Sequence, residues 1–127
     1  MSGNLLEKVY GRDILSLYLS NGKVVLPAST TQVFSRILYE LKTNMVRDVQ
    51  VIQHDFKNIE IQIKIDENLR NGGPSIEDVF MLIKKGFQEK VGSDVKIDVK
   101  EVKKIDRKGA RIISKIDMNK FTITGYV

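Results

Sequence analysis

The sequence contains no cysteine and a single histidine. A chain without thiols forms no disulfide and offers no thiolate nucleophile. Structural zinc sites need clustered cysteine and histidine, so we expect no metal site. The one histidine, His54, stands at the end of a predicted strand, without a serine, cysteine or carboxylate at a recognisable catalytic spacing. We interpret it as a partly exposed turn residue.

Long apolar runs are also missing. No stretch approaches the roughly 20 residues that a membrane-spanning helix requires, and the opening MSGNLLEKVYGR lacks the apolar region of a secretory signal. Together with the absence of cysteine, this leads us to expect a cytoplasmic protein with no membrane partner. Hydrophobic residues make up 42% of the chain and charged residues 29%, which is typical of a globular protein. A chain of 127 residues is long enough for one domain.

Phosphate-binding loops and base-stacking aromatics are absent as well. The segments NGKVV and LRNGGPS lack the glycine spacing and the lysine–hydroxyl ending of a phosphate loop. The basic stretch 96–115 contains no aromatic residue, so single-stranded bases would find no stacking platform there. We therefore expect no nucleic-acid partner. The net charge of +5 favours anions in general, or is simply that of a soluble surface.

The pattern of apolar residues predicts a β-hairpin near the start of the chain. Asn21-Gly22 is typical of a tight turn whose two central residues both have positive φ, and it separates arms at 13–20 and 23–27. Further strand-like runs follow along the chain. They span 46–54, 59–65, 95–99, 110–116 and 120–127.

Two amphipathic helices are predicted between these strands. The first begins at Ser29, which forms a capping-box pattern with Gln32. The second begins after Ser75 and ends at Gly92, a residue type that often follows a helix C-terminus. Gly86 lies inside the second helix at a cost of about 1 kcal/mol relative to alanine. We expect it to allow a close contact between helix and sheet.

Residues 59–65 show the clearest alternation in the chain. Four isoleucines point to one side, and Glu60, Gln62 and Lys64 point to the other. A strand with one dry face needs cover on that face alone. If one hairpin arm joins the sheet, the order becomes β-α-β-β-α-β. We therefore predict an α+β, ferredoxin-like antiparallel sheet with two helices on one face, preceded by the hairpin.

The segment IDRKGARIISKI, residues 105–116, gathers cations around a glycine. They are Arg107, Lys108, Arg111 and Lys115, on either side of Gly109. One interpretation is a solvated basic turn. The other is a loop that aims one lysine at phosphate or carboxylate charge as it develops, a task for which a compact charge on a flexible stem is suited.

Several short motifs in sequence order resemble one known family. They are YGRDIL, NGKVVLP, VQVIQ and VGSDVKIDVKEVKKIDRKGARIISKI, and together they cover about residues 9–117. In this order they resemble the C-terminal domain of the phenylacetate–CoA ligase family. That family belongs to the adenylate-forming, AMP-dependent ligases and includes relatives tied to capsular polysaccharide biosynthesis.

The resemblance implies a small lid domain that works with a larger N-terminal adenylation domain. In the intact enzyme ATP, magnesium and coenzyme A would take part, with ATP and magnesium bound mainly by the larger domain. The hinge would lie at Gly11, Arg12 and Asp13. We accordingly divide the chain into a hinge-proximal segment, 1–12, and a single C-terminal lid-type domain, 13–127.

The resemblance also implies roles for the basic segment. Lys108 is the best match to the catalytic lysine that the lid delivers to the adenylation centre. It would bridge the substrate carboxylate and the α-phosphate, and Arg107 and Arg111 would add anion binding. The domain would be inactive alone. The alternative from another class is a stand-alone ferredoxin-like binding module for a small anion or a protein partner, with a hairpin edge suited to strand addition.

Overall fold

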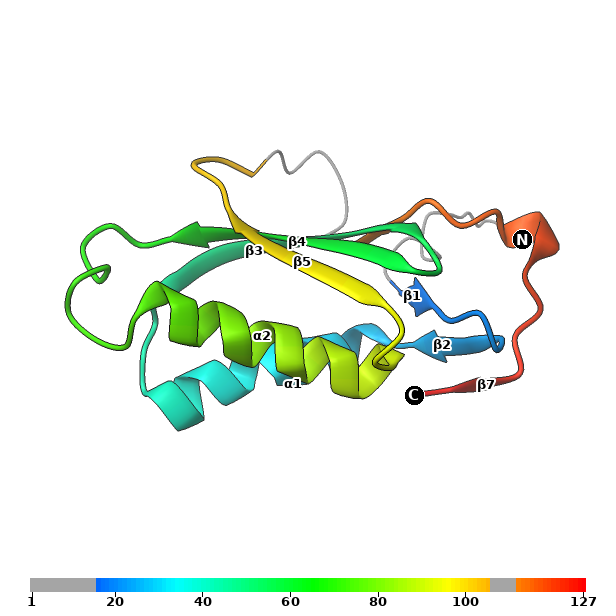
Figure 1. Ribbon diagram of the computed structural model, residues 1–127, viewed down its shortest axis with the longest axis horizontal. Helices are drawn as coiled ribbons and strands as arrows, with labels where there is room; N and C mark the ends of the chain where they lie inside the picture. Colours follow the sequence, from blue (N-terminus) through cyan, green and yellow to red (C-terminus); the bar gives the residue numbers. More distant parts are fainter. Residues whose placement is uncertain (1–15, 106–111) are drawn as a thin grey trace, which may run out of the picture.

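The computed structural model describes residues 16–105 and 112–127. Two helices lie side by side against one face of a four-stranded sheet, and a smaller three-stranded sheet closes one end of the molecule (Figure 1). The strands are β1 (Leu17–Tyr18), β2 (Lys23–Val25), β3 (Val46–Asp55), β4 (Asn58–Ile65), β5 (Lys96–Glu101), β6 (Ile112–Ser114) and β7 (Gly125–Tyr126). The helices are α1 (Pro27–Arg36), continued by one π-helical turn η2 (Ile37–Leu41), α2 (Ile76–Val91) and the short η3 (Met118–Lys120). The predicted α+β class is confirmed.

The main sheet has the order β5-β4-β3-β6 and is mixed, so the prediction of an antiparallel sheet is wrong. Strands β3 and β4 form an antiparallel hairpin, whereas β5 is parallel to β4 and β6 is parallel to β3. The chain leaves β4, passes through α2 and returns in the same direction as β5, as a helical crossover requires. β5 therefore takes the position beside β4 that the ferredoxin-like order reserves for a hairpin arm.

The hairpin forms as predicted, but it belongs to the small sheet. β1 pairs with β2 in antiparallel register, and β2 pairs with β7 in parallel register. Neither arm pairs with β4, because β5 occupies that edge of β4 from Asn58 to Ile63. The turn also differs from the prediction. Gly22 has a φ of 89° and Asn21 has no positive φ, which fits a three-residue loop ending in a left-handed glycine.

Helix α1 begins two residues before the predicted start. Pro27 occupies the first turn, where a missing N–H and a fixed φ cost nothing, and no side chain caps this end. Ser29 therefore lies within the helix, and its hydroxyl donates to the Val127 carbonyl at 2.8 Å instead of forming the predicted capping box. The predicted cap of α2 is confirmed, because the Ser75 side chain accepts a hydrogen bond from the Asp78 N–H at 3.1 Å.

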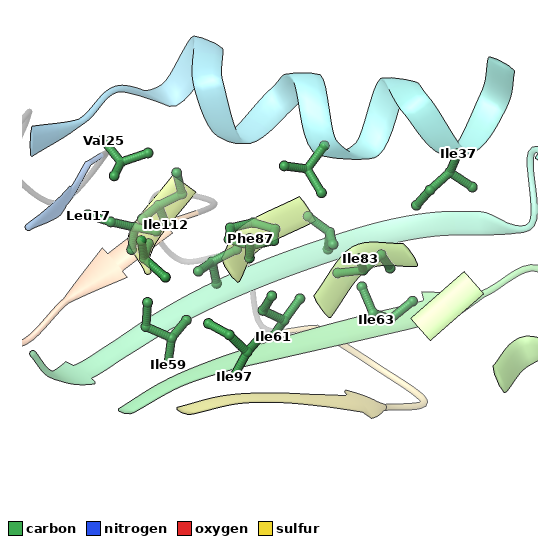
Figure 2. Close-up of a cluster of buried hydrophobic side chains, with 14 of the residues drawn as sticks. Leu17, Val25, Ile37, Ile59, Ile61, Ile63, Ile83, Phe87, Ile97 and Ile112 are labelled. Carbon is green, nitrogen blue, oxygen red and sulfur yellow. The ribbon is translucent and has the colours of Figure 1, made fainter. Parts of the chain in front are cut away.

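The core fills the space between the helices and the inner face of the main sheet (Figure 2). Ile59, Ile61, Ile63 and Ile65 of β4 are all at most 3% exposed, which confirms the dry face that the alternation predicted. Phe87 of α2 is fully buried above them. The polar residues between the isoleucines lie on the opposite, outer face of the sheet and are partly exposed. Burial on one face alone explains why both helices lie on the same side.

Gly86 makes a close contact between the two helices and not, as predicted, between helix and sheet. A methyl group at this position would lie 2.7 Å from Cγ1 of Val33 on α1. Valine is stiff at χ1, so the contact cannot relax by a simple rotation. The absence of a side chain at Gly86 therefore sets how closely α1 and α2 approach.

We expect Gly86→Ala to lower the free energy of unfolding by about 1 kcal/mol, because overpacking outweighs the better helix propensity of alanine. In a Val33→Ala background the same change should instead be neutral or stabilising. Urea denaturation of the four chains of this cycle measures both effects. Gly72→Ala serves as control, since a methyl group there meets no atom within 4 Å. Equal losses in both backgrounds would contradict the helix–helix explanation.

Candidate functional site

The residues to which the resemblance assigns a role in the hinge, in catalysis or in anion binding all lie outside the described part of the chain. They are Gly11, Arg12 and Asp13 of the predicted hinge, and Arg107, Lys108 and Arg111 of the basic segment. The residues that flank these two segments are described, however. β1 begins at Leu17, four residues after the predicted hinge, and β6 begins at Ile112, directly after Arg111. The described residues on either side of these two segments therefore define the surroundings of the candidate site.

The two flanks lie against each other in the fold. β1 of the small sheet contacts β6 at the edge of the main sheet. Leu17 is fully buried and Ile112 is 5% exposed, and both belong to the core (Figure 2). The segment that follows the predicted hinge and the segment that follows the basic residues thus share one buried region.

One buried polar side chain connects these flanks. Gln53 of β3 is 1% exposed and lies on the core face of its strand. Its Oε1 accepts hydrogen bonds from the Tyr18 N–H at 3.0 Å and from the Ser114 hydroxyl at 2.8 Å. Its Nε2 donates to the Tyr18 carbonyl at 2.6 Å. A buried carboxamide needs such partners, because an unpaired polar group in the core costs free energy.

The backbone of Gln53 adds a further link. Its carbonyl accepts from the Lys115 N–H at 2.9 Å, and Gln53 is the register partner of Ser114 in the parallel β3–β6 pair. We call Gln53, Tyr18 and Ser114 the clasp. Sequence reasoning missed it, although a signal was present. Val49, Val51 and Gln53 share one face of the strand, so a polar residue stands where the pattern requires an apolar one.

The other end of the basic segment is also anchored. β5 ends at Glu101, whose carboxylate binds the guanidinium of Arg70. Arg70 also binds Glu67, and the two carboxylates raise the pKa of Arg70 above its ordinary value. Beyond β5, Ile105 is 8% exposed. Residues 106–111 are therefore flanked on both sides by a buried isoleucine.

The outer face of the main sheet carries a polar network around Glu60. Its Oε1 lies 2.9 Å from Nε2 of His54, and its Oε2 accepts from Gln62 at 2.7 Å. These hydrogen bonds, from Gln62 first and then His54, lower the pKa of the Glu60 carboxyl below its ordinary value. Lys100 of the neighbouring strand β5 lies 3.9 Å from the same carboxylate. Glu60 is thus held in its charged form.

His54 occupies the half-exposed position at the end of β3 that the sequence predicted. Its Nδ1 lies 3.3 Å from Nζ of Lys115, and its Nε2 faces Glu60. An ammonium only donates and a carboxylate only accepts, so the neutral ring carries its proton on Nε2. Lys115, the last cation of the basic stretch, is in this way turned toward the outer face of the sheet.

The described residues contain neither a cluster of metal-ligating side chains nor a membrane-spanning helix. Across 16–105 and 112–127, no group of three or more histidine, aspartate or glutamate side chains is arranged to hold one. No helix in these ranges is both long enough and apolar enough to cross a membrane.

A comparison with family models decides the relationship. The model described as the CapK C-terminal domain matches residues 17–115. The chain belongs to this family. The matched region runs from the first residue of β1 to just beyond β6, so it contains both helices, the main sheet and the whole clasp.

The family assignment confirms the predicted relationship in part. The chain is related to the C-terminal domain of CapK, a protein of capsule biosynthesis, and is thus a domain type that forms the C-terminal part of a larger protein. The phenylacetate–CoA ligase assignment stays a prediction. Comparison with the curated proteins and with the solved structures gave no match.

The Glu60 network predicts a pH dependence. Because the pKa of Glu60 is lowered in the fold, its contribution to stability is present above the ordinary value of 4.5 and is lost as the pH falls through the folded pKa. We expect the free energy of unfolding to drop less in Glu60→Gln than in the unchanged chain between about pH 5 and about pH 3. Urea denaturation at each pH measures this.

Glu77→Gln provides the control, because Glu77 is an exposed carboxylate on the first turn of α2. This variant should keep the acid sensitivity of the unchanged chain. An unchanged acid sensitivity in Glu60→Gln would show that the hydrogen bonds to Glu60 do not stabilise the fold.

Proposed function

We propose that this chain is the lid domain of an AMP-forming acid–CoA ligase that resembles phenylacetate–CoA ligases. An upstream adenylation domain of the same protein would be its partner. The domain assists adenylation of a carboxylic acid and transfer of the acyl group to coenzyme A, and it has no activity alone. Membership of a C-terminal domain family and the motif order of residues 9–117 both support this proposal.

The observation that carries the proposal is the meeting of β1 and β6 at the clasp. A lid must connect its hinge rigidly to the group that it delivers, since a displacement of about 1 Å can cost a hundredfold in rate. Here the strand after the predicted hinge and the strand after the predicted lysine are joined through one buried side chain. This link between the two flanking strands supports the proposed lid function.

Each predicted residue receives a role in this proposal. Gly11, Arg12 and Asp13 form the hinge. In the first half-reaction a carboxylate oxygen of the acid attacks the α-phosphorus of ATP, and pyrophosphate leaves. Lys108 neutralises charge between the carboxylate and the α-phosphate during this step. Arg107 and Arg111 add positive charge that attracts the anionic reactants.

The second half-reaction releases AMP. The sulfur of coenzyme A attacks the acyl carbon of the adenylate, the thiol proton passes to solvent, and AMP leaves as the thioester forms. We assign ATP and magnesium to the upstream domain, as the resemblance of residues 9–117 to the phenylacetate–CoA ligase family implies. The contribution of this chain to both steps is then the position and charge of its side chains.

In the full-length protein we expect Lys108→Ala to slow adenylate formation by at least about a hundredfold, as does the loss of a group that stabilises transition-state charge. Thioester formation from a supplied acyl-adenylate should change by less than about threefold, since Lys108 serves the first step. Pyrophosphate exchange into ATP and a thioester assay measure the two half-reactions separately.

Lys104→Ala is the matched control. It removes an exposed lysine from the same basic stretch, four residues away, and should leave both half-reactions unchanged. Equal losses of both half-reactions in Lys108→Ala would contradict the proposed role of this lysine. The absence of any ATP-dependent adenylation by the full-length protein would contradict the ligase proposal as a whole.

A further inference from the structure

At the border between the two sheets, the side-chain amide of Gln53 makes hydrogen bonds of the kind that the backbone of a neighbouring strand makes. Tyr18 pairs with Val24 of β2 on one side of β1. On the other side its N–H and its carbonyl both bind the carboxamide of Gln53, at 3.0 and 2.6 Å. A side-chain amide thus continues the hydrogen bonding of the small sheet toward the main sheet.

The same carboxamide also reaches β6. Its Oε1 is shared between the Tyr18 N–H and the Ser114 hydroxyl, and the Ser114 oxygen in turn accepts from the Ile116 N–H at 3.4 Å. Three of the four hydrogen bonds available to a carboxamide are therefore made. An apolar residue at this buried position would avoid the desolvation cost of a carboxamide. We therefore attribute the presence of glutamine here to its hydrogen bonds.

We infer that Gln53 is a positioning residue, which makes β1 and β6 respond as a single unit through the clasp. A displacement of β1 is then passed to β6, although Tyr18 and Ser114 share no direct hydrogen bond. The catalytic consequence rests on the proposed function: rotation at a hinge upstream of β1 would carry with it the strand that follows the basic segment. The mechanical coupling itself does not depend on that function.

Hydrogen exchange of single amides tests the coupling in the 127-residue chain. Ser114→Ala removes the β6 branch of the clasp and leaves both hydrogen bonds between Gln53 and Tyr18 in place. We expect the Tyr18 amide to exchange about three- to tenfold faster in this variant, as the loss of a typical buried hydrogen bond implies. Ser35→Ala makes the same chemical change at a partly buried position on α1 and should leave this rate unchanged.

Gln53→Met is the second variant, because methionine keeps the length of the side chain without its hydrogen bonds. Here the amides of Tyr18 and Lys115 should both exchange at least about tenfold faster, since the bonds to both strands weaken together. An unchanged Tyr18 rate in Ser114→Ala would overturn the coupling. So would faster exchange at Tyr18 alone in Gln53→Met, because β6 would then be held independently.

The full-length protein supplies the catalytic test. Ser114→Ala should lower kcat for adenylation about fivefold and leave KM for ATP unchanged, because it misplaces a group without altering the ATP site. If Lys108→Ala is neutral while Tyr18 exchange still rises in Ser114→Ala, the coupling holds and the proposed function fails. If Lys108→Ala slows adenylation while Ser114→Ala changes neither the exchange rate of the Tyr18 amide nor kcat, the coupling fails and the proposed function holds.

Discussion

One-sided burial of β4 is the constraint on which the rest of the structure depends. Its four isoleucines point into the core, and the polar residues between them point outward. Both helices must cover the inner face, because no apolar surface of β4 requires cover on the other side. The outer face is left free for a charged network centred on Glu60, which apolar packing would exclude.

The helices follow from the same constraint. α1 and α2 cover one face of a narrow sheet, so they must lie close together, and Gly86 permits the close approach at Val33. The crossover through α2 then sets β5 parallel to β4. β6 takes the opposite edge, beside β3, and the small sheet closes the end of the core that the helices leave open.

Local patterns in the sequence predicted the elements well and their arrangement less well. The alternation in 59–65, the hairpin, the cap at Ser75 and the stop at Gly92 were predicted because each depends on a few neighbouring residues. The strand order was not, because it depends on which edge each strand joins, and that choice is made by contacts distant in the sequence. The capping box at Ser29 was wrong because Pro27 fits the first turn better.

The candidate site shows the same division. Motif order led to a family of C-terminal domains, and the family match confirms that level of the prediction. Gln53 was missed because one polar residue in an apolar strand looks like an exception until its partners are known. Those partners lie 35 and 61 residues away in the sequence, so only the folded chain brings them together.

The clasp and the Glu60 network divide the two faces of β3 between two tasks. On the inner face Gln53 uses three of its four possible side-chain hydrogen bonds to hold strands β1 and β6. On the outer face His54 and Lys115 contact each other beside Glu60, at the point where β6 ends. The chain direction after β6 is thus fixed from both sides of the sheet.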